Sequence, residues 1–274
     1  MTKVAAIQMA SGPNLGANLI EAGRLISDAA EAGSKLIVLP ENFAMMGLTE
    51  TDNLQVKEQQ GQGPIQDFLR EQAIKHKIWI VGGTFPLAVG DGDKALASCL
   101  VINEQGQLVG HYDKIHLFDV VIEENGESYT ESDTIQAGDH ILVINTPFGK
   151  LGIAVCYDLR FPEMFRAMVE LGVEIIAVPS AFTAITGKAH WETLVRARAI
   201  ENLSYVIAAG QGGYHIGGRE THGDSMVVDA WGNILDRLYR GSGVVTADID
   251  VAQLQTVRAA FPSLNHRKFK VESI

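Results

Sequence analysis

A cysteine at the end of an apolar run is the residue in this chain best placed for nucleophilic chemistry. Residues 152–155 read Gly-Ile-Ala-Val, which predicts a strand that ends at Cys156. A turn and then a helix should follow, because Pro162 suits the first position of a helix. The positive end of that helix and the nearby Arg160 would favour the thiolate over the thiol. Cys156 is therefore a candidate nucleophile, and the alternative is a small buried apolar side chain.

Charged side chains follow two other predicted strands. Glu41 comes after the apolar run at 36–39, and Lys114 comes after a strand that should end near Tyr112. Because reactive groups in open α/β folds collect beyond the carboxyl ends of strands, these side chains can meet Cys156 there. A carboxylate that accepts the thiol proton, a thiolate that attacks a carbonyl and an ammonium that binds the oxyanion can hydrolyse an acyl compound without a metal or cofactor. Taken singly, each charge is more often a solvated one, and only the joint placement indicates a site.

The apolar runs predict a layered α/β fold. The runs at 36–39 and 175–178 are apolar throughout, which indicates strands that are buried on both faces. The glycine fingerprint of a doubly wound nucleotide-binding fold does not follow the first strand. Helices are expected at 15–33, 63–77, 162–171 and 189–203, and strands at 4–9, 35–40, 78–82, 95–103, 108–112, 140–146, 150–155, 173–179, 205–210, 225–229, 234–238 and 244–248, with 140–146 and 150–155 paired as a hairpin.

Composition and charge argue against several classes of protein. The 274 residues are 46% hydrophobic and 20% charged, and no linker or repeat divides them, so one domain spanning 1–274 is expected. Lys and Arg number 22 against 33 Asp and Glu, and the net charge of −11 argues against nucleic acid as a partner. The apolar run at 4–7 is too short for a signal peptide and no stretch could span a membrane, so the cytoplasm is the expected location. Cys99 and Cys156 form no disulfide framework, and no Cys/His cluster indicates a metal.

Three segments resemble the signature motifs of the nitrilase, or carbon–nitrogen hydrolase, superfamily. They are Leu-Pro-Glu-Asn at 39–42, Tyr-Asp-Lys-Ile-His-Leu-Phe-Asp at 112–119 and Ala-Val-Cys-Tyr-Asp-Leu-Arg-Phe-Pro-Glu at 154–163. They occur in the family's order, and similar sequence runs from Val4 to about His266. The resemblance implies a four-layer α-β-β-α sandwich, a Glu-Lys-Cys triad and hydrolysis of non-peptide C–N bonds. It also implies assembly through helices near the nucleophile into a homodimer or a larger homo-oligomer.

The same resemblance implies a role for each residue of the motifs. Glu41 is the general base, Cys156 is the nucleophile, and Lys114 stabilises the tetrahedral intermediates, with the main-chain N–H of Tyr157 as a second oxyanion donor. The family's second glutamate matches Glu131, which would orient the lysine or the substrate amide. On sequence alone Glu131 is equally well explained as a surface charge, because it lies in a polar segment.

Within the superfamily, the chain is similar to the branch of deaminated-glutathione amidases and ω-amidases. The similarity is carried by residues 179–192, 194–202 and 222–232. It implies a small amide substrate, in the first place glutathione whose amino group has become a ketone, cleaved to 2-oxoglutarate and cysteinylglycine. The alternatives are an ω-amidase acting on 2-oxoglutaramate, a nitrilase, carbamoylase or acyltransferase on the same scaffold, and a binding protein without catalysis.

A keto-acid substrate needs a cation for its carboxylate. Arg160 has the right chemistry, because a guanidinium can bind a carboxylate through two hydrogen bonds. An ion pair of Arg160 with Asp158 or Glu163 is the alternative. Phe182 and Thr183 follow the next predicted strand and are expected in the wall of the substrate pocket, where the family comparison also places a substrate-contacting threonine.

Overall fold

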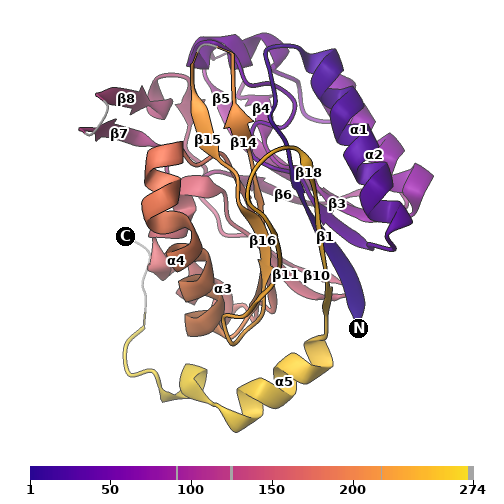
Figure 1. The fold of residues 1–274 in the computed structure, drawn as a ribbon, viewed down its shortest axis with the longest axis vertical. Helices are drawn as coiled ribbons and strands as arrows, with labels where there is room; N and C mark the ends of the chain where they lie inside the picture. The colour runs from indigo at the N-terminus through magenta and orange to yellow at the C-terminus, as the bar shows by residue number, and fades with distance from the viewer. Residues whose placement is uncertain (91, 124–125, 217, 271–274) are drawn as a thin grey trace.

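Two β-sheets form the centre of the molecule in the computed structural model, which describes residues 1–90, 92–123, 126–216 and 218–270 (Figure 1). In the first sheet β1, β2 and β3 run parallel, as does the short pair of β5 with β9, and the remaining pairs are antiparallel. Its order is β18 (Gly243–Ile249), β1 (Thr2–Gln8), β2 (Leu36–Val38), β3 (Trp79–Val81), β5 (Ala95–Ile102) and β4 (Phe85–Ala88), with β6 (Leu108–Asp113) and β9 (Ile135–Gln136) also paired to β5.

The second sheet has a parallel centre and antiparallel edges. Its order is β10 (Val143–Thr146), β11 (Gly149–Ile153), β12 (Ile175–Ser180), β13 (Tyr205–Gly210), β16 (Ser225–Val228) and β17 (Ile234–Leu238), and β11, β12 and β13 are the parallel strands. The predicted hairpin is confirmed as β10 and β11. Two further hairpins stand apart from the sheets: β7 (Asp119–Ile122) with β8 (Glu127–Thr130), and β14 (Gly212–Tyr214) with β15 (Glu220–His222).

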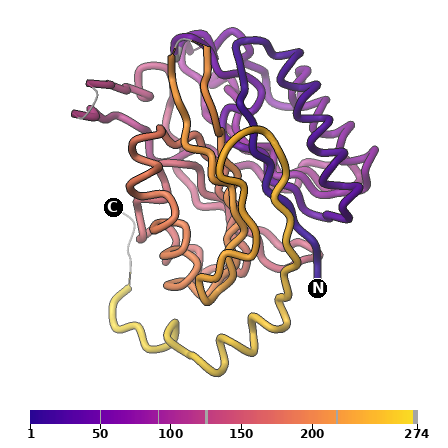
Figure 2. Tube along the Cα trace, viewed as in Figure 1, coloured from indigo at the N-terminus to yellow at the C-terminus, as the bar shows by residue number. Residues whose placement is uncertain are grey.

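Helices cover the outer face of each sheet, so the layers read helix, sheet, sheet, helix. Helices α1 (Leu15–Glu31) and α2 (Pro64–His76) lie on one side, α3 (Pro162–Glu170) and α4 (Ala184–Asn202) lie on the other, and α5 (Val251–Ala260) closes the lower end (Figures 1 and 2). Along β1, Ala5 and Ile7 pack with α1 and α2, whereas Val4 and Ala6 pack toward the second sheet. This burial on both faces explains the continuous apolar runs and confirms the expected α-β-β-α sandwich.

The differences from the predicted elements lie at short or solvated segments. Helix α4 begins at Ala184 rather than at residue 189, because the Thr183 side chain accepts a hydrogen bond from the backbone N–H of Thr186 and caps it. The strands β4, β7, β8, β9, β14 and β15 and the helix α5 were not expected. Each of these strands has four residues or fewer, too few to show a clear period in the sequence.

The loops at the carboxyl ends of the parallel strands from the two sheets are joined to each other. Gln211, just after β13, donates its side-chain amide to the carbonyl oxygen of Glu41 at 3.0 Å and to Ser11 Oγ at 2.8 Å. Its amide oxygen accepts the backbone N–H of Ser11 at 2.9 Å. One buried side chain therefore fixes the loop after β2 to the end of the second sheet.

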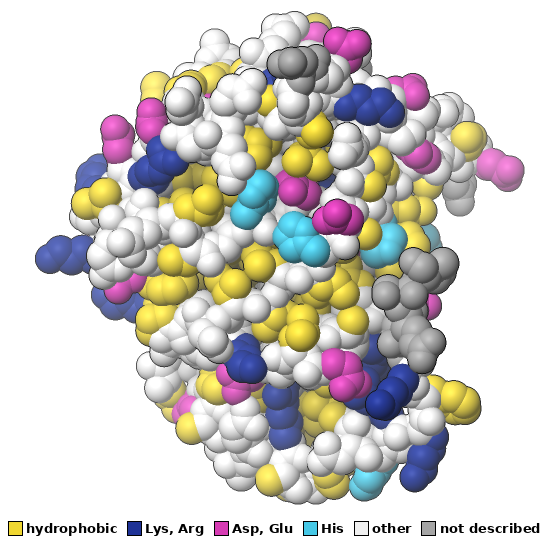
Figure 3. Space-filling model, turned by 180° about the vertical axis from the view of Figure 1, so that it is seen from behind, with side chains coloured by type: hydrophobic (Ala, Val, Ile, Leu, Met, Phe, Trp, Pro, Cys, Tyr) yellow, Lys and Arg dark blue, Asp and Glu magenta, His cyan; other side chains and the backbone are white. Residues whose placement is uncertain are grey.

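The surface shows mixed charge. On the face opposite to that in Figure 1, Lys and Arg side chains are interspersed with acidic and apolar ones (Figure 3). Within the residues that the structure describes, no helix combines the length and apolar character needed to cross a bilayer.

Candidate active site

A cavity of about 800 Å³, counting the space at its open mouth, lies where loops of both sheets meet. The first sheet supplies Glu41, three residues after β2, and Lys114, directly after β6. The second sheet supplies Cys156, three residues after β11, and Phe182, two residues after β12. The residues expected from the sequence thus line one cavity, as the strand-end argument predicts.

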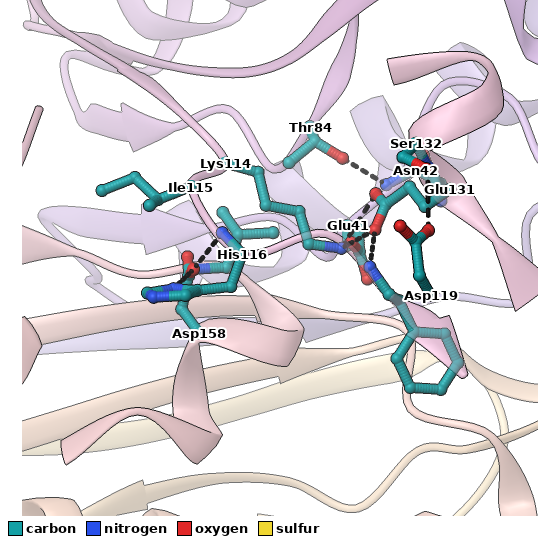
Figure 4. Close-up of polar contacts among 12 residues, drawn as sticks. Glu41, Asn42, Thr84, Lys114, Ile115, His116, Asp119, Glu131, Ser132 and Asp158 are labelled. Carbon is teal, nitrogen blue, oxygen red and sulfur yellow. Dashed lines mark hydrogen bonds and ion pairs between the residues drawn. The ribbon is translucent and has the colours of Figure 1, made fainter. Parts of the chain in front are cut away.

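The ammonium of Lys114 is enclosed between two carboxylates (Figure 4). Its Nζ atom lies 2.9 Å from Oε1 of Glu41 and 2.9 and 2.8 Å from the two carboxylate oxygens of Glu131. The lysine side chain is only 2% exposed. The backbone N–H of Phe118 donates a further hydrogen bond of 2.7 Å to Glu131. Glu131 is therefore part of this buried cluster and is not a surface charge.

Burial and charge act against each other in this cluster. Burial alone would lower the pKa of Lys114, but attraction to Glu131 and then to Glu41 raises the pKa well above its ordinary value. Burial raises the pKa of the Glu131 carboxyl, Lys114 opposes the rise, and the negative charge of Glu41 adds to it. Lys114 therefore carries a positive charge near neutral pH. The carboxyl groups of Glu41 and Glu131 both depend on this single ammonium as their counter-charge, so their titrations are coupled.

Cys156 sits on a strained turn that presents its sulfur to the cavity. It begins the 3-10 helix Cys156–Arg160 and has a φ of +48°, in the left-handed region that costs a residue other than glycine about 1–3 kcal/mol. The side chain of Glu41 and the backbone N–H of Ala181 lie near enough to the sulfur to act on the pKa of its thiol. A carboxylate is thus in place to take the thiol proton.

The sequence predicts that Cys156 has a lowered pKa and is present as a thiolate, and this prediction is wrong. Burial raises the pKa of the Cys156 thiol well above its ordinary value, the charge of Glu41 raises it further, and Lys114 lowers it by less. Arg160 is not among the groups that act on this pKa, and its guanidinium donates a hydrogen bond to Nδ1 of His190 at 3.2 Å. Near neutral pH the side chain of Cys156 is therefore a thiol rather than a thiolate.

The main-chain N–H of Tyr157 is available at the cavity. Tyr157 is the second residue of the 3-10 helix, and the first N–H groups of a helix have no partner within it. No hydrogen bond of this N–H to an acceptor occurs in the described ranges of the chain. Tyr157 lines the cavity with Cys156, so its N–H and the Lys114 ammonium are two donors for a developing oxyanion.

A buried carboxylate holds the cysteine turn against the lysine segment. Asp158 has no exposed surface and accepts the backbone N–H of Val155 at 2.7 Å, which closes the turn around Cys156. It also accepts the Tyr112 hydroxyl at 2.6 Å and both the backbone N–H and Nδ1 of His116, at 3.1 and 2.7 Å. Because Tyr112 and His116 flank Lys114 in the sequence, one side chain sets the spacing between nucleophile and ammonium.

Arg160 has aromatic neighbours and no carboxylate partner. Its guanidinium carbon lies 5.8 Å from the ring centre of Tyr157 and 5.2 Å from that of Phe182. Within the described residues, no salt bridge joins it to Asp158 or Glu163, so the alternative proposed from the sequence is wrong. Arg160, Phe182 and Thr183 all line the cavity.

Several residues of the site were not predicted from the sequence. Asp158 supports the cysteine turn without lining the cavity, and it had a usable signal, since an acidic residue in the first turn of a helix is a common capping arrangement. Other residues line the cavity and come from segments whose placement depends on the tertiary fold. They include Asn53, Tyr129, Thr134, Thr186 and Arg219.

Comparison with known proteins agrees with this geometry. The family model for carbon-nitrogen hydrolases matches residues 3–259. The chain belongs to the carbon–nitrogen hydrolase family. It is therefore a carbon–nitrogen hydrolase, an amidase of the nitrilase superfamily.

Relatives of this carbon–nitrogen hydrolase match it over nearly its full length. The chain is 42% identical to the deaminated glutathione amidase of Yersinia enterocolitica over 97% of its own length and 93% of that protein. The corresponding protein of Synechocystis is 43% identical, with 97% of both chains covered. The crystal structure of the NitFhit protein of Caenorhabditis elegans superimposes with a TM-score of 0.88 at 34% identity, covering 97% of this chain and 65% of that longer one.

Replacing Asp158 by asparagine should destabilise the hydrolase. An asparagine side chain has one acceptor oxygen instead of two, so donors from the turn and from the lysine segment would remain buried without partners. The expected loss in the free energy of unfolding is about 3 kcal/mol, measured by urea denaturation. Asp139→Asn is the matched control, because the Asp139 side chain is 96% exposed and its replacement should cause no measurable change. Equal midpoints for Asp158→Asn and the wild type would contradict the role given to Asp158.

Replacing Glu41 by glutamine should lower the pKa of the Cys156 thiol, because the negative charge that raises it is removed. The pH profile of iodoacetamide alkylation measures this, with the modified peptide identified by mass spectrometry. The midpoint should move to lower pH in Glu41→Gln and stay in place in Glu163→Gln, which removes an exposed acid outside the cavity. An unchanged or higher midpoint in Glu41→Gln would show that Glu41 does not act on the sulfur.

Proposed function

We propose that this amidase hydrolyses deaminated glutathione through a thioester on Cys156, releasing 2-oxoglutarate and cysteinylglycine. One observation carries the proposal of a thiol mechanism: Cys156, Glu41 and Lys114 line one cavity, in which Glu41 is hydrogen-bonded to the Lys114 ammonium and its charge acts on the thiol. The relatives named deaminated glutathione amidase support the choice of substrate. The guanidinium of Arg160 has no carboxylate partner among the described residues, which supports an anionic keto-acid end, since a guanidinium binds a carboxylate through two hydrogen bonds.

The first half of the proposed cycle forms the thioester. Glu41 takes the proton of the Cys156 thiol as the sulfur attacks the amide carbonyl, and the negative charge moves to the carbonyl oxygen. The Lys114 ammonium and the N–H of Tyr157 stabilise that oxyanion. When the tetrahedral intermediate collapses, the C–N bond breaks and Glu41 returns the proton to the leaving amine. The acyl group remains on sulfur as a thioester.

The second half consumes one water. Glu41, again a carboxylate, takes a proton from water as its oxygen attacks the thioester carbonyl, and the same two donors bind the new oxyanion. Collapse breaks the C–S bond, the sulfur recovers its proton from Glu41, and the acid leaves. Glu131 does not exchange protons in this scheme. It positions the ammonium, because it contacts Lys114 through both carboxylate oxygens.

The proposed substrate is tested by comparing specificity constants. Deaminated glutathione should be hydrolysed with a kcat/KM at least tenfold above that of 2-oxoglutaramate, a difference of about 1.4 kcal/mol in transition-state binding. Cys156→Ala should abolish hydrolysis of both amides. Cys99→Ala is the control, because Cys99 lies buried in β5 and not in the cavity. A tenfold preference for 2-oxoglutaramate would instead assign the chain as an ω-amidase, and full activity of Cys156→Ala would refute the thiol mechanism.

We also propose that the enzyme is a homodimer whose contact includes the outer face of α4. Apolar side chains are exposed together beside that helix: Ile200 packs near Gly232, and Trp231 stacks edge-on with Phe261 at 5.6 Å. Exposed apolar groups of this kind favour association. Sedimentation equilibrium should give a dimer mass or a multiple of it, and Ile200→Glu should shift the population toward monomer. A monomer at all concentrations of the wild type would refute the assembly.

A further inference from the structure

A second hollow adjoins the active-site cavity. This outer hollow has a volume of about 1340 Å³, counting open solvent, and is lined mainly by polar residues of the segments 46–53, 127–134 and 216–219. Four residues line both spaces and so mark the passage between them: Asn53, Tyr129, Thr134 and Arg219. A substrate longer than a simple amide would reach this passage.

Arg219 is the cation of the passage. It lies just before β15, in the connection from β14, while Tyr129 belongs to β8, and both hairpins stand in the upper half of the view in Figure 1. The guanidinium carbon lies 5.3 Å from the ring centre of Tyr129, close enough for a cation–π contact. The arginine thus contacts the face of an aromatic ring rather than a carboxylate.

Two arginines, Arg160 and Arg219, differ from the others in the groups that they contact. Within the described part of the chain, eight arginines form salt bridges with carboxylates: Arg24, Arg70, Arg166, Arg196, Arg198, Arg237, Arg240 and Arg267. Arg258 instead donates to two carbonyl oxygens and to a serine hydroxyl. Arg160 and Arg219 remain, and both line the active-site cavity. In a protein with a net charge of −11, two cations without carboxylate partners at one cavity indicate anionic ligands.

Arg219 also has an unmet hydrogen-bonding requirement. Its Nε atom is buried and has no hydrogen-bond acceptor among the described residues. A buried donor without a partner costs free energy. The terminal NH groups of the guanidinium have no hydrogen bond among the described residues, and these are the groups that can bind a carboxylate or another anion. Glu127 and Asp133 also line the outer hollow, and their negative charges would repel an anion. Among the residues that line this hollow, Arg219 provides the positive charge that an anion needs.

We propose that Arg219 binds the carboxylate at the far end of the leaving group. This inference rests on the proposed function, because the proposed substrate carries one carboxylate on its keto-acid end and a second on its glycine end. Arg160 lies beside the turn of the nucleophile and contacts Tyr157 and Phe182, which suits the acyl end. Arg219 lies at the opening to the outer hollow, which suits the dipeptide. An amide whose leaving group is only ammonia has no leaving-group carboxylate that Arg219 could bind.

The test removes the charge from the enzyme and, separately, from the substrate. The substrates are deaminated glutathione and the same compound with its glycine carboxylate converted to a carboxamide. The variants are Arg219→Met and Arg219→Lys, with Arg240→Met as the control. Arg240 pairs with Glu220, next to Arg219 in the sequence, but does not line the cavity. For each combination kcat and KM are measured separately.

In the wild type, kcat/KM for the free acid should exceed that for the carboxamide by about tenfold or more, the size of one charge-assisted contact. Arg219→Met should bring the two values within about twofold, mainly by raising KM for the acid, whereas Arg219→Lys should keep part of the preference. Arg240→Met should keep all of it.

The outcomes separate this inference from the proposed function. If the wild type hydrolyses the acid and the carboxamide equally well, or if Arg219→Met lowers both values by the same factor, the Arg219 subsite is wrong and the proposed reaction stands. If the wild type hydrolyses neither compound but does hydrolyse 2-oxoglutaramate, the proposed substrate is wrong, and the subsite is wrong with it.

Discussion

The contact between one ammonium and two carboxylates determines the architecture of this site. Glu41 and Glu131 come from segments far apart in the chain, and without a cation their charges would repel each other in a buried space. Lys114 supplies that cation and is itself acceptable in the interior only because both acids surround it. The three side chains therefore stabilise one another as a unit. The thiol of Cys156 lines the same cavity and feels the charges of Glu41 and Lys114.

The backbone around this cluster is fixed by two other buried polar groups. Asp158 joins the turn of Cys156 to the residues on either side of Lys114, and Gln211 joins the loop of Glu41 to the end of β13. Both side chains satisfy several backbone donors or acceptors that a loop would otherwise expose to water. Loops that carry reactive groups are in this way held as firmly as the strands that they follow. This support is independent of whether a substrate is bound.

Much of this arrangement could be predicted from the sequence. Continuous apolar runs predict doubly covered strands, and the residues directly after them, Glu41, Lys114 and Cys156, prove to line one cavity. The acidity of the thiol was predicted in the wrong direction, because a local argument from helix and arginine omits burial and the charge of Glu41. Arg219 could not be found at all. It lies in a glycine-flanked turn whose position is set by a contact with a residue 90 positions earlier, Tyr129.

The residues of the cluster come from both sheets and from the hairpin of β7 and β8. Glu41 and Lys114 follow β2 and β6 of the first sheet, and Glu131 follows β8 of the hairpin. Cys156 and Phe182 follow β11 and β12 of the second sheet. The separation between the residues of the first sheet and those of the second is therefore set by the thickness of the apolar layer between the sheets, to which Val4, Ala6 and Val38 contribute. Protein interiors are packed as densely as organic crystals, so a lost methyl group in that layer shifts the sheets by fractions of an ångström. Substitutions in this apolar layer should therefore change the turnover rate at temperatures at which the protein is still fully folded.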